Sequence, residues 1–119
     1  MITDLKIFDV YGAMARHAAE RQRVSATNIA NADSPGYRAI EVEPFDAYLG
    51  RQANMGAADL SAGTFRLQGT NAVASPNGNT VTLEEAIFES AQASGQHAMA
   101  LTVYTKSLDL LRAAMGKSR

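Results

Sequence analysis

The sequence predicts a mainly α-helical protein, with long N- and C-terminal helices that pair as an antiparallel, coiled-coil-like hairpin. Between them we expect an irregular middle that contains a short extended or β arm. Residues 1–32 and 82–119 contain no proline, whereas residues 33–81 hold all three prolines and six of the nine glycines. Because 119 residues allow one core, we expect a single domain with helix 1–32, middle 33–81 and helix 82–116.

The N-terminal helix is predicted from a stripe of residues spaced three and four apart. The stripe consists of Phe8, Tyr11, Ala15, Ala18, Gln22, Ala26 and Ile29. Three of these seven residues are alanines, so a second helix can approach closely there. Each contributes little burial energy, however, when nothing packs against it.

The C-terminal helix is predicted from a capping box and a seven-residue repeat. Thr82 and Glu85 form the capping box that begins the helix. Two interleaved lines follow, one of Ile87, Ser94, Leu101, Leu108 and Met115, the other of Ser90, His97, Tyr104 and Leu111. We interpret the two lines as a coiled-coil-like seam, with interface residues Ile87, Leu101, Tyr104, Leu108 and Leu111.

The middle begins with a turn and an alternating segment. Pro35 and Gly36 occupy the two central positions of a four-residue turn, the arrangement typical of type II. Residues 38–43 then alternate apolar and charged, which predicts a short strand or extended arm. Residues 50–80 are poor in large apolar groups, and we expect them to be mobile in the free monomer.

Composition excludes several classes of function. The net charge of −1 gives no reason to expect nucleic acid or anionic lipid as a partner, and the absence of cysteine excludes disulfides and thiolate metal sites. No secretory signal is visible at the N-terminus, and no apolar run approaches the roughly 18 residues of a membrane span.

No constellation predicts an active site, a metal site or a cofactor. His17 and Glu20 have a spacing that some metal sites use, but we interpret His17 as a solvent-facing helix residue. Glu41 and Glu43 share one side of the predicted strand, and we interpret them as a solvated face. We therefore expect no catalytic residues and no enzyme.

The content of large aliphatic and phenyl side chains predicts a marginal monomer. Leu, Ile, Val and Phe together number 24, whereas alanine alone numbers 22. Such a chain lies near the composition at which isolated chains stop folding. We expect neighbouring subunits to supply the missing stability.

The most specific feature is the block from Asn28 to Tyr37. It consists of a small-residue helix end with two asparagines three apart, followed by the turn that presents Tyr37. From the residues alone it is either a helix end followed by an ordinary loop or an interaction motif. In the second case the asparagines satisfy backbone groups and Tyr37 is an anchor.

This block closely resembles the N-terminal signature of the rod and hook axial proteins of the bacterial flagellum, N-I-A-N-x-x-[ST]-x-G-Y. Its places are filled by Asn28, Ile29, Ala30, Asn31, Ser34, Gly36 and Tyr37. Residues 77–85 and 111–116 are similar to the proximal-rod members of that family. The resemblance covers about residues 5–45 and 77–116.

The resemblance implies a structural subunit of the proximal rod, which assembles into a hollow helical drive shaft. It implies partners in copies of the same chain, other rod proteins, and the ring and export-gate proteins at the rod base. It also implies export through the flagellar type III apparatus, without a cleaved signal, to the periplasmic basal body. The interface residues implied at the turn are Asn28, Ile29, Asn31, Pro35, Gly36 and Tyr37. The alternative is a small secreted helical-hairpin adaptor.

Overall fold

The computed structural model describes residues 2–54, 60 and 63–116. The elements in chain order are α1 (Ile2–Ala30), β1 (Ile40–Val42), α2 (Phe45–Asn54), β2 (Leu67–Gly69) and α3 (Leu83–Gly116). The molecule is elongated, with extents of 67 × 29 × 15 Å. Its mainly helical architecture, with two long terminal helices and a small β arm between them, confirms the predicted fold class.

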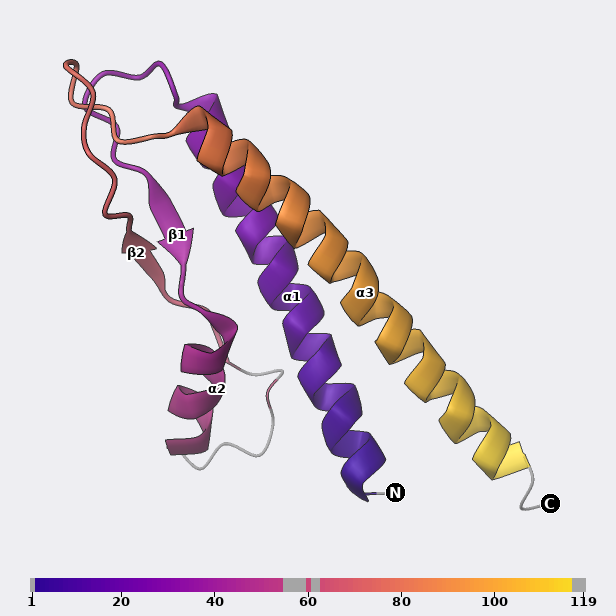
Figure 1. Ribbon diagram of the computed structural model, residues 1–119. Helices are drawn as coiled ribbons and strands as arrows, with labels where there is room; N and C mark the ends of the chain where they lie inside the picture. The colour runs from indigo at the N-terminus through magenta and orange to yellow at the C-terminus, as the bar shows by residue number, and fades with distance from the viewer. Residues whose placement is uncertain (1, 55–59, 61–62, 117–119) are drawn as a thin grey trace.

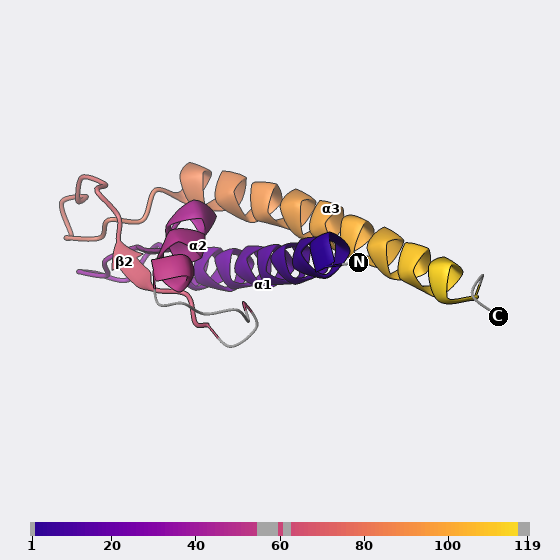
Figure 2. The same cartoon turned by 90° about the horizontal axis from the view of Figure 1, so that it is seen from below.

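The two long helices form an antiparallel hairpin whose open end carries both chain termini (Figures 1 and 2). α1 has 29 residues and α3 has 34, which corresponds to about 50 Å for the longer helix. The two-stranded sheet and α2 lie on the side of α1 away from α3 (Figure 1). Thus α1 is the central element and packs against both other parts.

The contact between α1 and α3 is built from alanines. Ala86, Ala93 and Ala100 recur every seven residues on α3 and are all buried. Ala15 and Ala18 are buried on α1, as the predicted stripe requires. Side chains this small let two helices approach closely, so dispersion contacts extend along the backbone itself. We refer to Ala86, Ala93 and Ala100 as the alanine row.

Only one of the two predicted lines of the seam faces α1 within the molecule. Ser90, His97, Tyr104 and Leu111 are half-buried, and the Tyr104 ring lies 3.9 Å from that of Phe8. Ile87 and Leu101 follow the alanine row by one residue and remain 53% and 43% exposed. The predicted seven-residue repeat is therefore present. Its buried positions lie one residue earlier, at alanines, which are too small to stand out in the hydrophobic pattern of the sequence.

A polar contact crosses the hairpin in the half nearer its loop end. The Arg21 guanidinium of α1 donates to Glu89 (2.7 Å), Gln92 (2.9 Å) and Gln96 (2.5 Å) of α3. Hydrogen bonds to three side chains spread over two turns fix how far α1 is shifted along α3. Glu89 also neutralises the charge of this largely buried arginine.

The middle segment contains more regular structure than expected. β1 pairs antiparallel with β2, with Ile40 opposite Gly69 and Val42 opposite Leu67. The helix α2 was not predicted, because ten residues give too short a periodic signal. Of the region predicted to be mobile, residues 55–59 and 61–62 lie outside the described residues, and the mobility of the remainder stays a prediction.

Aromatic rings hold this middle segment together. Tyr48 is fully buried, and its ring lies 6.0 Å from that of Phe45 and 4.6 Å from that of Phe65. His17 of α1 contacts the two phenylalanine rings at 5.4 and 5.2 Å. The cluster therefore attaches the arm to α1.

Two sequence interpretations were wrong at this contact. His17 is 4% exposed rather than solvent-facing, and its Nε2 lies 2.7 Å from the carbonyl oxygen of Glu43, to which it donates. Glu43 is also buried, and its carboxylate pairs with Arg51 at 2.6 Å. The expected short strand is present at residues 40–42, but the following helix supplies a cation, Arg51, that makes burial of Glu43 possible.

Among the described residues, none of the helices is both long and apolar enough to span a lipid bilayer.

A larger side chain in the alanine row should separate the two helices. Ala93 is fully buried, so we expect Ala93→Leu to lower the free energy of unfolding by about 1–3 kcal/mol through overpacking. Ala98→Leu, at an exposed position of the same helix, is the control and should change it little. Urea unfolding followed by circular dichroism measures both. Equal stability of the two variants would contradict the close packing.

Candidate functional site

Asn79 joins the two ends of the hairpin at the loop end. Its side-chain amide donates to the carbonyl oxygens of Asn31 (2.8 Å) and Ser34 (2.7 Å), which lie just after α1. Its Oδ1 accepts from the backbone N–H of Val81 at 2.7 Å, two residues before α3. The Asn79 residue is 2% exposed. We call residues 28–37 and 77–82, with these contacts, the asparagine clasp.

Asn28 performs the equivalent role between α1 and the arm. Its Nδ2 donates to the carbonyl oxygen of Ile40 (2.7 Å), and its Oδ1 accepts from the N–H of the same residue (3.1 Å). The side-chain amide thus takes the place of a neighbouring strand along the edge of β1. The Tyr37 hydroxyl donates to the same Oδ1 at 3.3 Å.

The predicted turn is present. Gly36 has a φ of +73°, and the N–H of Tyr37 donates to the Ser34 carbonyl oxygen at 3.2 Å, as a four-residue turn requires. Gly78, with a φ of +85°, lies against it, and a Cβ on Gly78 would be 3.3 Å from the Gly36 Cα. The positive φ favours glycine at both positions. At Gly78 the close contact with Gly36 also leaves little room for a side chain.

Backbone hydrogen bonds complete the clasp. The N–H of Gly36 donates to the Asn77 carbonyl oxygen at 2.9 Å, and that of Thr80 donates to the Tyr37 carbonyl oxygen at 2.9 Å. The Thr80 hydroxyl accepts from the N–H of Ala39 at 2.7 Å. The clasp therefore satisfies backbone groups of the segments that follow α1 and precede α3.

The predicted turn residues fall into two groups. Asn28 is buried, and Asn31, Tyr37 and Ile29 are half-buried within the clasp. Pro35 and Gly36 are exposed at its tip. Sequence reasoning missed the part that Asn79 and Thr80 play, although the Asn77-Gly78 pair is a turn signal that pointed to a tight loop there.

Two apolar flanks of α3 lie on opposite sides of the alanine row. Residues that follow the row by one make up the leucine flank: Ile87, Ser94, Leu101 and Leu108. Residues on the preceding side make up the methionine flank: Phe88, Gln92, Met99, Lys106 and Leu110. At about 100° per residue the two flanks diverge. Phe88 and Leu110 are 65% and 72% exposed, so α3 is apolar well beyond its contact with α1.

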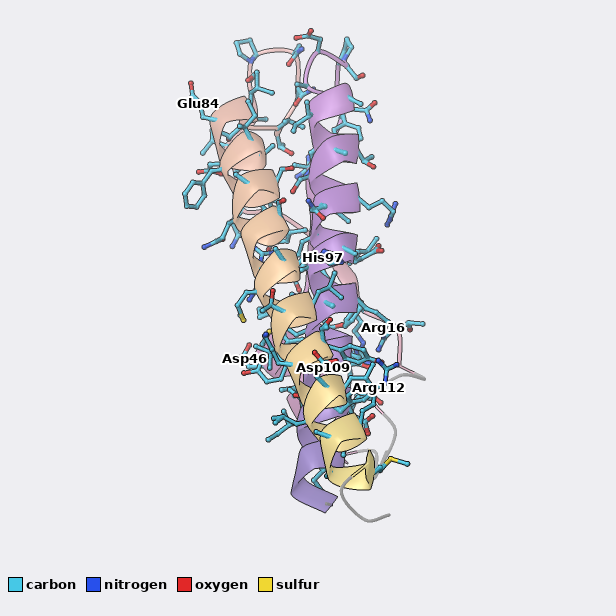
Figure 3. All side chains as sticks on the ribbon, turned by 90° about the vertical axis from the view of Figure 1, so that its right-hand side faces the viewer. Arg16, Asp46, Glu84, His97, Asp109 and Arg112 are labelled. Atoms are coloured by element: carbon cyan, nitrogen blue, oxygen red, sulfur yellow. The ribbon has the colours of Figure 1, made fainter. Side chains whose placement is uncertain are left out.

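A groove of about 430 Å³ runs between α1 and α3 on the leucine flank. Its floor is apolar and mostly small, and it is lined chiefly by Phe8, Gly12, Ala15, Ala19, Leu101 and Tyr104. Arg16 and His97, which also line it, are labelled in the view onto the outward face of α3 (Figure 3). Such a groove suits an apolar side chain from a neighbouring helix.

The His, Asp and Glu side chains of the described residues do not gather in one place. Within this part of the chain, no three or more His, Cys, Asp or Glu side chains come together as a metal site would need. On the outer side of α1, hydrogen bonds from Arg23 hold the pKa of the Glu20 carboxyl below its ordinary value, and partial burial opposes this shift. This pair is a surface ion pair within one helix.

The described residues thus form an elongated hairpin with a clasped loop end and exposed apolar residues on both flanks of α3. No family model matches the chain. Over 45 residues it is 40% identical to the flagellar basal body rod protein FlgB of Agrobacterium fabrum (strain C58). That stretch covers 38% of this chain and 34% of the length of the relative. The partial likeness is therefore to a protein of the flagellar basal-body rod.

Removing the Asn28 side chain should release β1 from α1. In Asn28→Ala both backbone groups of Ile40 lose their partner, and we expect the free energy of unfolding to fall by about 1–3 kcal/mol. Faster amide exchange at Ile40 should accompany this loss. Asn71→Ala, at an exposed loop position, is the control. Unchanged exchange at Ile40 in Asn28→Ala would contradict the assigned role.

Proposed function

We propose that this chain is a structural subunit of the flagellar basal-body rod, and specifically of its proximal part. The asparagine clasp carries the proposal, because the signature residues Asn31, Gly36 and Tyr37 are hydrogen-bonded there to residues 77–80. The fourth signature residue, Asn28, accepts from the Tyr37 hydroxyl. The residues that carry the resemblance thus hold the hairpin together at its loop end. The partial likeness to a flagellar rod protein supports the same class.

The shape and surface suit a subunit of a tube wall. The hairpin is 67 Å long, and its C-terminal helix exposes apolar residues on both flanks. A helix that is apolar on most of its circumference is normally surrounded by other helices. In the proposed rod, neighbouring hairpins cover these flanks, and the clasp and the Arg21 contact stiffen each subunit against shear.

The scarcity of large buried side chains in the subunit explains why assembly would stabilise it. Among the described residues, Tyr48 is the one large side chain that is fully buried, and the hairpin contact itself is made of alanines. Binding partners that recognise only the folded state stabilise it by mass action. Folding and incorporation are coupled in this proposal, which agrees with passage through an export channel in an unfolded state.

The proposed partners are further copies of the chain, other rod proteins, and the ring and export-gate proteins at the rod base. The proposed location is the periplasmic basal body. The residues available to neighbours are the exposed Pro35 and Gly36 at the tip and, on the leucine flank, the exposed Ile87 and Leu101 with the half-buried Leu108. Asn28, Ile29, Asn31, Tyr37, Tyr104 and Leu111 support these surfaces from within.

The clasp can be tested through the backbone of Gly36. A β-branched residue at a φ of +73° costs about 1–3 kcal/mol, although no atom would obstruct its Cβ. We expect Gly36→Val to be exported but missing from purified basal bodies, with the cells non-motile. Tyr37→Ala should act in the same direction. Gly36→Asn, which tolerates this φ, is the control and should be incorporated. Incorporation of Gly36→Val at the wild-type level would show that the turn only connects α1 to the arm and has no role in assembly.

The leucine flank can be tested without unfolding the monomer. Leu101 is 43% exposed, so an aspartate there stays hydrated in the free chain but not beneath a neighbouring subunit. We expect Leu101→Asp to keep its helical circular dichroism and to abolish swarming and incorporation into basal bodies. The control is Thr102→Asp, on the outward side of the same helix.

Normal swarming of Leu101→Asp would remove the leucine flank from the assembly surface. A wild-type chain that is folded and secreted but never found in basal bodies would favour the helical-hairpin adaptor instead.

A further inference from the structure

The two long helices present unlike surfaces on their two sides. On the leucine-flank side, Gly12, Ala19 and Ala26 of α1 recur every seven residues, and the first two line the groove beside α3. Ala19 and Ala26 are exposed, and no side chain larger than a methyl group stands at these three positions. This side is therefore hollow, and it contains the 430 Å³ groove.

The methionine flank, on the other side of α3, projects. Phe88, Met99 and Leu110 there are 65%, 45% and 72% exposed. Ridges of large side chains on one helix pack into the grooves between small side chains on another. The groove and the ridge of one molecule face different directions, so they cannot pack together within the same chain.

Opposite charges on the groove and on the methionine flank favour one axial alignment of two copies. The ring contact between Phe8 and Tyr104 places Asp9 and Lys106 at nearly the same height along the hairpin. Asp9 lines the groove, and Lys106 belongs to the methionine flank. When two copies lie side by side without an axial shift, Lys106 of one therefore reaches Asp9 of the next. At the same alignment Met99 lies level with Ala13, and Ala19 lies six residues, about 9 Å, further toward the loop end.

Resting on the proposed function, we infer that the methionine flank of one copy docks into the α1–α3 groove of a second copy in the same axial orientation. The contact is heterologous: each copy uses its ridge toward one neighbour and its groove toward the other. A contact of this kind repeats around a ring or helix. A two-fold pairing of groove with groove would bring together two floors of small residues and leave both ridges uncovered.

The chain has no cysteine, so single cysteines report the contact directly. One tagged variant carries Ala19→Cys in the groove and one untagged variant carries Met99→Cys on the ridge. The two are mixed at high protein concentration and treated with a short bis-maleimide. We expect abundant cross-linking between the two variants and only background cross-linking within either variant alone.

Charge reversal then tests the alignment. Asp9→Lys in the Ala19→Cys chain, or Lys106→Asp in the Met99→Cys chain, should lower the yield of the mixed product by about two- to fivefold, the range for an exposed ion pair. Both reversals together should restore it. The matched control places Asp9→Lys in the Met99→Cys chain, whose groove takes no part in the cross-linked pair, and should leave the yield unchanged.

Three outcomes overturn the inference: equal cross-linking of Ala19→Cys with itself, no mixed product, or no restoration by the double reversal. The proposed function is judged separately by incorporation of the wild-type chain into basal bodies. A chain that is incorporated but gives no mixed product is a rod subunit with a different lateral contact.

Discussion

The close approach of α1 to α3 along the alanine row is the constraint on which the remaining structure depends. It requires methyl groups at Ala86, Ala93 and Ala100, and it leaves the larger residues of α3 on the two flanks. The hairpin therefore gains little hydrophobic energy from its own interior. Polar contacts at Asn28, Asn79 and Arg21 determine how the helices are aligned, because a contact between alanines is nearly uniform along its length.

This dependence on polar contacts for the alignment of the helices explains why the signature block lies at the loop end of the hairpin. An alanine contact provides attraction without much specificity, so the loop end must determine where α1 stops and α3 begins. Asn79 does so by binding two carbonyl oxygens beyond α1, and Asn28 places β1 beside α1. Each asparagine supplies both a donor and an acceptor from one flat group, which aspartate or alanine cannot do.

Much of the fold could be predicted from the sequence, because proline placement and helical periodicity are local signals. The turn at Gly36 was predicted from the Pro-Gly pair, and its positive φ confirms it. The burial of His17 and Glu43 could not be predicted, since it depends on Arg51 and on rings brought together by tertiary packing. At the candidate site, the first half of the clasp was visible as a motif. Its joining to Asn79 depends on a contact across 48 residues.

That separation in sequence has a consequence for the order of folding. The contacts of Arg21 span 68 to 75 residues, and those that close the loop end span 45 to 48. Helical proteins usually fold fast because their contacts are local, whereas distant contacts first require closure of a long loop. A chain that emerges from its N-terminus presents a complete α1 well before any of its partners in α3 exist. The hairpin therefore forms late, and α1 remains an isolated helix of marginal stability until more than two thirds of the chain has emerged.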